Sequence, residues 1–175
     1  MAVKKMIQMN ASMKKLAQRK SIFGFLHSNN CEISSTVINF ISNLKLYRED
    51  NQKWLSLAKS PLMYDEHQSF DWKYDDIISS FGGLTYYECE SNEIFFDKKD
   101  IKGRFWESIR FILSEMENYL MQFFSNNIFC IIISVQFGKM ANINVKIHML
   151  RDGEFYLDKD LDNYSQPVLY ETLYV

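Results

Sequence analysis

The histidine and cysteine residues of this chain are scattered too widely to predict a metal or catalytic centre. They are His27, His67, His148, Cys31, Cys89 and Cys130. A zinc site needs several such ligands in closing geometry, and no second histidine lies three or four residues from any of the three. An odd number of cysteines at unrelated spacings favours free thiols in a reducing cytosol over a disulfide framework. We therefore expect a cytoplasmic protein without a metal or another cofactor.

Two of these residues fall in stretches that predict strands. His148 lies beside Lys146 in residues 143–149, where polar and apolar residues alternate, so we expect a solvated or hydrogen-bonded histidine on the polar face. Cys130 is embedded in an apolar run, where a thiolate is disfavoured, so we expect a structural thiol.

Three further patterns are incomplete versions of known motifs. Asp158-Lys-Asp-Leu-Asp-Asn163 resembles the start of a calcium loop, but the sixth position is Asn163 instead of glycine and the twelfth is Leu169 instead of glutamate. Gly82-Gly83 lacks the lysine of a phosphate-binding loop. Neither a nucleophile elbow nor a Cys-x-x-Cys pair is present. We therefore predict no catalytic residues and a protein that is not an enzyme.

Residues 64–76 place acidic and aromatic side chains close together. One interpretation is an acidic helix start whose aromatic residues turn into the core. The other is an exposed surface, on which carboxylates attract a basic partner and aromatic rings exclude water from the contact. The candidate partner-binding residues are Glu66, Asp71, Trp72, Tyr74, Asp75 and Asp76, with Asp158 and Asp160 as a second group.

The elements that must position these residues are clearest in the second half of the chain. Residues 128–137 are rich in β-branched and aromatic side chains, which indicates a buried strand, and 143–149 alternate as a half-exposed strand does. Residues 105–124 carry apolar side chains three and four apart, which predicts a helix that covers the sheet. The predicted fold is α+β, with a mainly antiparallel sheet packed against helices in a single domain.

The remaining elements follow from local patterns and turn residues. We predict helices near residues 37–44, 50–57 and 71–81, the last of them ending at Gly82. We predict a hairpin of 84–90 with 93–97, a second hairpin of 143–150 with 154–158 across Asp152-Gly153, and an edge strand at 168–175.

Charge divides the chain into two parts. Residues 1–20 carry six basic and no acidic side chains, with methionines at helical spacing, which predicts a basic amphipathic helix. Residues 21–175, the predicted single domain, hold 14 basic and 22 acidic side chains. Such an acidic body binds phosphates poorly, so we expect no direct nucleic-acid partner. No apolar run is long enough to span a bilayer, so we expect no membrane partner.

Several stretches are similar to those of a known family. Phe81-Gly-Gly-Leu-Thr-Tyr-Tyr87, His148-Met-Leu-Arg-Asp-Gly-Glu154 and Gln166-Pro-Val-Leu-Tyr-Glu171 resemble small bacterial immunity proteins of contact-dependent growth inhibition systems. The resemblance spans about residues 30–175 and lies in general appearance, so it transfers no site residue. It implies a cytosolic, non-enzymatic protein that binds and neutralises one cognate toxin domain. The toxins of these systems are often nucleases with basic clefts.

The sequence thus leads to one favoured function and two alternatives. The favoured function is that of an immunity-type inhibitor which occludes the basic cleft of a toxin domain, in particular a nuclease. One alternative is a non-enzymatic adaptor or structural protein that docks through its basic N-terminal helix. The other is a small enzyme with an unrecognised site.

Overall fold

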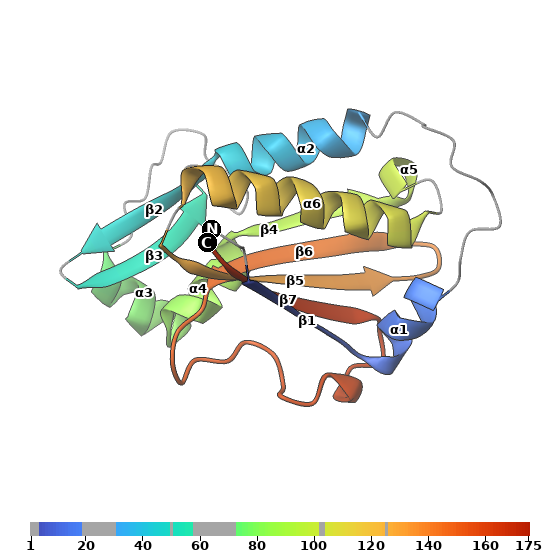
Figure 1. Ribbon diagram of the computed structural model, residues 1–175. Helices are drawn as coiled ribbons and strands as arrows, with labels where there is room; N and C mark the ends of the chain where they lie inside the picture. The colour runs from blue at the N-terminus through green and yellow to red at the C-terminus, as the bar shows by residue number, and fades with distance from the viewer. Residues whose placement is uncertain (1–3, 19–30, 50, 58–72, 102–103, 125) are drawn as a thin grey trace.

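The computed structural model describes residues 4–18, 31–49, 51–57, 73–101, 104–124 and 126–175 (Figure 1). Within these residues, helices pack against a five-stranded antiparallel sheet, and a separate two-stranded hairpin lies beside it. This is the predicted α+β architecture. None of the described helices is long and apolar enough to cross a membrane.

The large sheet has the strand order β1-β7-β5-β6-β4, and all neighbours are antiparallel. Its strands are β1 (Lys4–Met9), β4 (Glu93–Asp97), β5 (Ile128–Gln136), β6 (Asn142–Met149) and β7 (Val168–Tyr174). The predictions of strands at 128–137, 143–149 and 93–97 are confirmed. The most apolar strand, β5, lies in the middle of the sheet, where both of its edges are paired.

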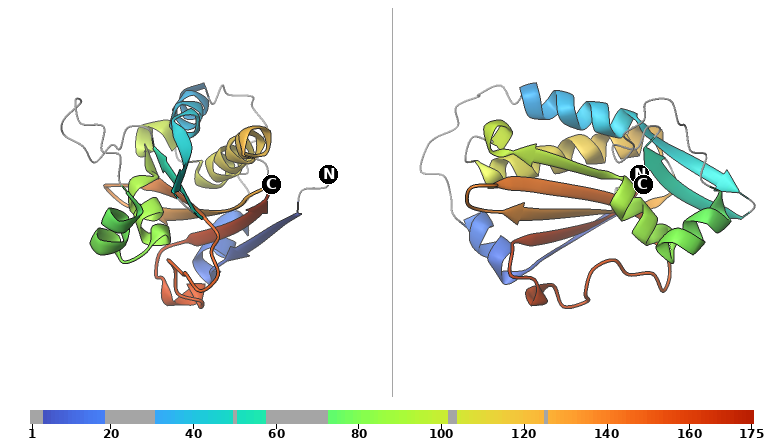
Figure 2. Two further views of the ribbon diagram at one scale, coloured as in Figure 1. Left: turned by 90° about the vertical axis from the view of Figure 1, so that its left-hand side faces the viewer. Right: turned by 180° about the vertical axis from the view of Figure 1, so that it is seen from behind.

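One face of the sheet is covered by α6 (Phe105–Phe123) and α2 (Cys31–Ser42), as Figures 1 and 2 show. Alternate residues of β5 and β6 point into this layer, and α6 meets them with one apolar face, which confirms the predicted helix. The buried residues of α6 in this core are Ile109, Ile112, Leu113, Met116 and Leu120. Full burial of each such side chain stabilises the fold by about 1.5–3 kcal/mol.

The opposite face is covered by α4 (Leu84–Ser91) and by the chain that leads from β6 to β7, which contains a short 3-10 helix at Leu161–Asn163. The hairpin of β2 (Leu44–Glu49) and β3 (Gln52–Leu57) lies beside α4 and α3 (Tyr74–Phe81). Trp54, Ile77, Leu84 and Tyr87 form a second, smaller apolar cluster there. The two remaining helices are α1 (Ala11–Gln18) and α5 (Lys98–Ile101).

The predicted helix over residues 1–20 is wrong, because Lys4–Met9 is a strand and only Ala11–Gln18 is helical. β1 pairs with β7 along its whole length, which takes precedence over the helical spacing of the methionines. Asn10 ends the strand and caps α1, since its Oδ1 accepts a hydrogen bond from the main chain of Met13 at 2.8 Å. Residues 4–9 are therefore part of the sheet.

The predicted strand at 84–90 is also wrong, because these residues form α4. The side chains of Leu84, Tyr87, Glu88 and Ser91 are buried, and their spacing of three and four is that of a helix. Residues 93–97 consequently pair with β6 instead of with 84–90.

Three further expectations about hairpins and edges are wrong. The helix predicted at 50–57 is absent from the described part of this stretch, because residues 52–57 form strand β3 of the β2–β3 hairpin. Residues 154–158 form no strand, because β4 and β5 already occupy both edges of β6. The last strand, β7, is not an edge strand, because β1 pairs with its outer side. The predicted helix at 71–81 is present as α3, and it ends as expected at Gly82, whose φ of 73° lies in the left-handed region.

Candidate functional site

The residues predicted to bind a partner fall into three groups. Glu66, Asp71 and Trp72 lie outside the described residues. Tyr74, Asp75 and Asp76 form the first turn of α3. Asp158 and Asp160 precede the 3-10 helix. Figures 1 and 2 place α3 and the 3-10 helix at opposite ends of the sheet, so the structure does not bring these two groups together.

The first turn of α3 combines one half-buried ring with two exposed carboxylates. Tyr74 packs against the small apolar cluster, and its main-chain N–H donates a hydrogen bond to Oε2 of Glu49 at 2.7 Å. Asp75 and Asp76 are exposed, and neither has an ion-pair partner among the described residues. Negative charge in a first turn is favourable for the helix dipole, and it leaves both carboxylates accessible to a partner.

Asp158 and Asp160 stabilise their own loop. Oδ1 of Asp158 accepts a hydrogen bond from the main chain of Asp160 at 2.9 Å, and Oδ2 accepts one from Nδ2 of Asn163 at 2.8 Å. These two bonds lower the pKa of Asp158. Oδ1 of Asp160 in turn accepts a hydrogen bond from the main chain of Asp162. The geometry therefore assigns these carboxylates a role in turn formation.

A cavity of about 440 Å³ lies between α4, the sheet and the chain that follows β6. Strands β5 and β6 supply its floor, α4 supplies one wall and residues 156–166 supply the other. Its polar and aromatic lining includes Tyr86, Glu90, Lys146, Tyr156, Tyr164 and Gln166. We call this hollow the α4 cavity.

A charged cluster lies at the base of the α4 cavity. Nζ of Lys146 donates hydrogen bonds to Oη of Tyr156 at 2.9 Å and to Oε1 of Glu90 at 3.1 Å, and it lies 3.3 Å from Oε1 of Glu93. Tyr156 donates to the same Glu90 oxygen at 2.7 Å. The two carboxylates outnumber the one ammonium group, so the cluster carries a net negative charge when all three groups are ionised.

The pKa values in this cluster are displaced away from neutrality. Desolvation acts to lower the pKa of Lys146, but its hydrogen bonds to Tyr156 and Glu90 outweigh that effect and raise it. The hydrogen bond from Tyr156 lowers the pKa of Glu90. Desolvation raises the pKa of Tyr156 to about 12. The lysine and Glu90 are therefore both ionised at neutral pH.

Aromatic rings form the rim of the α4 cavity. Tyr86 is 49% exposed and makes an edge-to-face contact with Tyr156, with ring centroids 5.6 Å apart. Half-exposed rings beside a hollow are typical of contact surfaces, because they combine large apolar area with few rotatable bonds.

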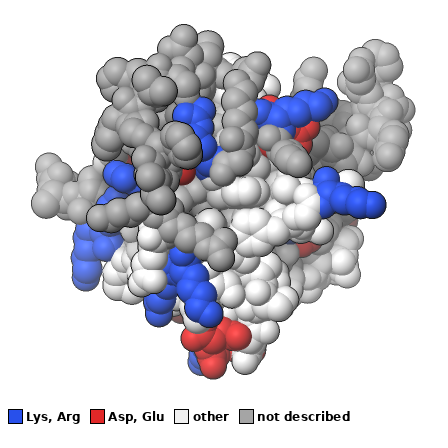
Figure 3. All heavy atoms as spheres, turned by 90° about the vertical axis from the view of Figure 1, so that its right-hand side faces the viewer, with Lys and Arg blue, Asp and Glu red and all other residues white. Residues whose placement is uncertain are grey.

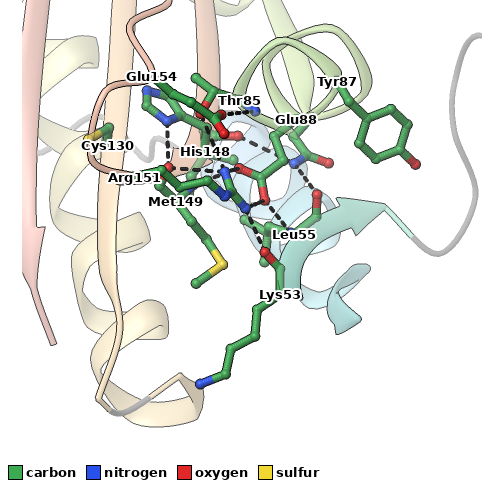
Figure 4. A network of polar contacts seen from close by, with 12 residues as sticks. Lys53, Leu55, Thr85, Tyr87, Glu88, Cys130, His148, Met149, Arg151 and Glu154 are labelled. Atoms are coloured by element: carbon green, nitrogen blue, oxygen red, sulfur yellow. Dashed lines mark hydrogen bonds and ion pairs between the residues drawn. The ribbon is translucent and has the colours of Figure 1, made fainter. Parts of the chain in front are cut away.

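Below the α4 cavity, a buried ion pair fixes α4 to the sheet (Figure 4). Nη1 and Nη2 of Arg151 each donate a hydrogen bond of 2.8 Å to one carboxylate oxygen of Glu88, which is fully buried. The main-chain N–H groups of Leu55 and Met149 also donate to this carboxylate. Burial raises the pKa of Glu88, and the bonds from Arg151 and the two amides oppose the shift. The carboxylate thus joins α4, β3 and β6.

A second contact attaches the chain after β6 to the start of α4. Oε2 of Glu154 accepts a hydrogen bond of 2.9 Å from the main chain of Thr85, in the first turn of the helix. A carboxylate at this position also interacts favourably with the helix dipole. Glu154 and Arg151 therefore connect α4, one wall of the α4 cavity, to the chain that follows β6.

His148 on β6, Cys130 on β5 and Cys89 on α4 itself are buried and not accessible. His148 is only 2% exposed because α4 covers this end of the sheet, and its Nδ1 lies 2.9 Å from the main-chain oxygen of Met149. Of the two expected states, the hydrogen-bonded histidine is therefore confirmed and the solvated one is wrong. Desolvation lowers the pKa of His148 to about 4, so the ring is neutral. Burial raises the pKa of Cys89 and Cys130, that of Cys130 to about 11. Both cysteines are free and buried, as expected of structural thiols.

The other end of the molecule has a different character. At the end that carries α1 and the β5–β6 turn, an uncharged area is bordered by several Lys and Arg side chains and, at its lower edge, by Asp or Glu side chains (Figure 3). A hollow of about 330 Å³ lies here, lined by Lys15, Leu16 and Phe137 among others.

Sequence reasoning missed Glu88, Glu90, Lys146 and Arg151. In a strand at 84–90, Glu88 and Glu90 would point to the same side of the sheet. In the helix they point in different directions, so that Glu88 binds Arg151 and Glu90 binds Lys146. A helical reading of the buried positions 84, 87, 88 and 91 identifies Glu88 as a core residue in need of a cation.

No curated protein and no solved structure is found to match the chain. One family model does match, and it covers residues 8–173, which include every described element except the first four residues of β1 and the last residue of β7. The chain belongs to the Uncharacterized protein PM0498 family.

Proposed function

We propose that this chain is a non-catalytic inhibitor that binds a basic surface of a partner protein, as immunity proteins bind their toxin domains. The observation that carries the proposal is the combination of exposed acidic side chains on α3 with the net-negative, aromatic-rimmed α4 cavity on the adjacent helix. Carboxylates that lack an internal counter-ion are available to a partner's lysine and arginine residues.

The charges at the cavity suit recognition better than proton transfer. A general acid or base works best when its pKa lies near the working pH. Here the pKa of Lys146 is raised and that of Glu90 is lowered, because the two groups stabilise each other's charged forms. Fixed charges of this kind present a constant electrostatic surface to a partner over the neutral pH range.

The support beneath this surface favours binding without rearrangement. The Glu88–Arg151 pair and the Glu154–Thr85 bond hold α4 against the sheet and against the chain after β6. A contact surface that is rigid before binding loses less conformational entropy when the complex forms.

The partner that best fits the acidic surface is a toxin domain with a basic active-site cleft, in particular a nuclease. Carboxylates of the inhibitor then occupy the positions of the substrate phosphates, and the bulk of the inhibitor excludes the substrate. As the resemblance to contact-dependent growth inhibition immunity proteins implies, we propose that the chain acts in the bacterial cytoplasm.

The experiment uses the product of the gene immediately upstream of the one that encodes this chain. That protein is purified and titrated by calorimetry with the wild-type chain and with the Asp75→Lys/Asp76→Lys variant. We expect a 1:1 complex, neutralisation of the partner's toxicity on co-expression, and at least a tenfold weaker complex for the variant.

The matched control is Glu107→Lys/Glu115→Lys, which makes the same change in net charge on α6, in the helical layer on the other face of the sheet. The control variant is expected to bind like the wild type. An upstream product that is harmless to the cell and does not bind the chain would overturn the proposal, as would equal weakening by both double variants.

A further inference from the structure

We propose that the α4 cavity binds the guanidinium group of an arginine side chain of the partner. This inference rests on the proposed function and names the contact at its centre. It follows from the charge of the cavity, from a carboxylate oxygen without a hydrogen-bond partner, from the aromatic rim and from the size of the hollow.

The charge of the cavity selects a cation. Glu90 and Glu93 face Lys146 alone, so one negative charge remains after internal pairing. Oε1 of Glu90 accepts hydrogen bonds from both Lys146 and Tyr156, whereas Oε2 has no hydrogen-bond partner within the described parts of the chain. The Glu90 side chain is 47% exposed, so this second oxygen is within reach of a donor from outside.

The aromatic rim provides the second half of the site. A cation placed over a tyrosine ring is attracted by the negative face of the ring, and guanidinium groups also stack on such rings. Nζ of Lys146 already lies 5.1 Å from the ring centroid of Tyr156, so this ring already has a cation over its face. Tyr86 remains, half exposed at the mouth, with its hydroxyl group outside the internal network of the described residues.

The shape of the lining favours arginine over lysine. A cavity of about 440 Å³ admits one long side chain and lies near the lower end of the range for ligand sites. The ammonium position beside Glu90 and Glu93 is already filled by Lys146, so a second ammonium would be placed next to a like charge. A planar guanidinium spreads its charge and can donate to Glu90 Oε2 while it stacks on Tyr86.

The test needs only the chain itself and two small probes. The isolated wild-type chain is titrated with L-arginine amide and, in parallel, with L-lysine amide, and amide resonances in α4 and in residues 156–166 are followed by NMR. We expect saturable shifts at these positions, with arginine amide bound about fivefold or more tightly than lysine amide.

Two variants address the two halves of the site. Glu90→Gln preserves the shape of the side chain and removes its charge, and we expect it to weaken arginine amide about tenfold. Tyr86→Leu removes the ring at an exposed position, and we expect about fivefold weakening. Asp76→Asn, on α3, is the control and should leave the titration unchanged. If Glu90→Gln fails to fold, the titration of Tyr86→Leu still tests the arginine site.

Outcomes for this inference and for the proposed function are distinct. Absence of saturable shifts in the cavity, or equal affinity for the two amides, overturns the arginine site. If the upstream protein nevertheless binds and Glu90→Gln binds it as the wild type does, the function stands without this contact. If arginine amide binds in the cavity and the upstream protein does not bind, the cation site is supported and the proposed function is overturned.

Discussion

Arg151 donates two parallel hydrogen bonds of 2.8 Å to the carboxylate of Glu88, one from each terminal nitrogen. The pair joins residues 63 positions apart, and Nη2 of Arg151 also donates to the main-chain oxygen of Lys53 at 2.7 Å. One ion pair therefore connects α4, β3 and the chain after β6, and the α4 cavity depends on it for its shape.

Removal of one partner of this buried pair should destabilise the fold strongly. Arg151→Met leaves the Glu88 carboxylate buried without a cation, and we expect a loss of about 3–5 kcal/mol in the free energy of unfolding, measured by urea denaturation. Replacement of both residues, Glu88→Leu with Arg151→Met, should cost less than the sum of the two single changes. A loss below about 1 kcal/mol for Arg151→Met would contradict the role that we assign to the pair.

Glu171 makes the free energy of unfolding depend on pH. Its side chain on β7 is buried, and neither carboxylate oxygen has a hydrogen-bond partner among the residues that the structure describes. It faces Glu117 from α6 and Lys5 from β1, with Lys5 Nζ 3.0 Å from Glu117 and 3.9 Å from Glu171. Desolvation, followed by the charge of Glu117, raises the pKa of Glu171 from 4.5 to about 7 in the folded chain.

Because the folded chain holds this proton more tightly than the unfolded chain, the native state is favoured by protonation. The contribution of Glu171 is fully present below about pH 4.5 and is lost as the pH rises through about 7. Urea denaturation of the wild type at pH 5, 6, 7 and 8 should show this fall in stability. Glu171→Gln should lack most of it and be more stable than the wild type at pH 8; the same pH slope in both proteins would refute the assignment.

The two buried thiols should be unreactive in the folded protein. A thiolate is the reactive form, and burial raises the pKa of Cys89 and Cys130. In a Cys31→Ser variant, titration with a thiol reagent at pH 8 should detect less than about one tenth of a thiol per chain before urea is added and two thiols after unfolding. Rapid labelling of the native variant would show that the two thiols are not buried between α4 and the sheet.

Asn10 should be worth more to stability than its position near the terminus suggests. Its Oδ1 accepts hydrogen bonds from the main chain of Met13 and Val168, and its Nδ2 donates to the main-chain oxygens of Tyr164 and Gln166. Asn10→Ala removes a helix cap and leaves buried main-chain groups unpaired, and we expect a loss of about 2–3 kcal/mol. The exposed Asn118→Ala in α6 serves as control and should cost nothing measurable in the same denaturation assay.

The central strands and the long helix were predictable because burial of apolar side chains determines each of them. β5 is buried on both faces and α6 on one, so the apolar pattern in the sequence is also the pattern of burial. β1 and α4 were not predictable in the same way. Residues 4–9 form a strand that pairs with the edge of β7. Residues 84–91 form a helix in which buried Glu88 binds Arg151. Both partners are distant in sequence, so local patterns do not predict these contacts.

In the candidate site, too, local features were predictable and features made by residues distant in sequence were not. Exposed carboxylates at Asp75 and Asp76 follow from local composition at the start of a helix. The α4 cavity does not, because Glu90 and Lys146 are 56 positions apart and meet only after α4 has packed on β6. The loop role of Asp158 likewise depends on a turn that brings Asn163 back to it.

The central claim is that negative charge on the α3–α4 side attracts a basic protein. Its most direct test is the association rate with the upstream gene product, measured by stopped-flow fluorescence between low and high salt. We predict fast association for the wild type that slows steeply with salt, and association on the order of tenfold slower and less salt-dependent for Asp75→Lys/Asp76→Lys. Association rates that are equal for the two proteins at every salt concentration would contradict the claim.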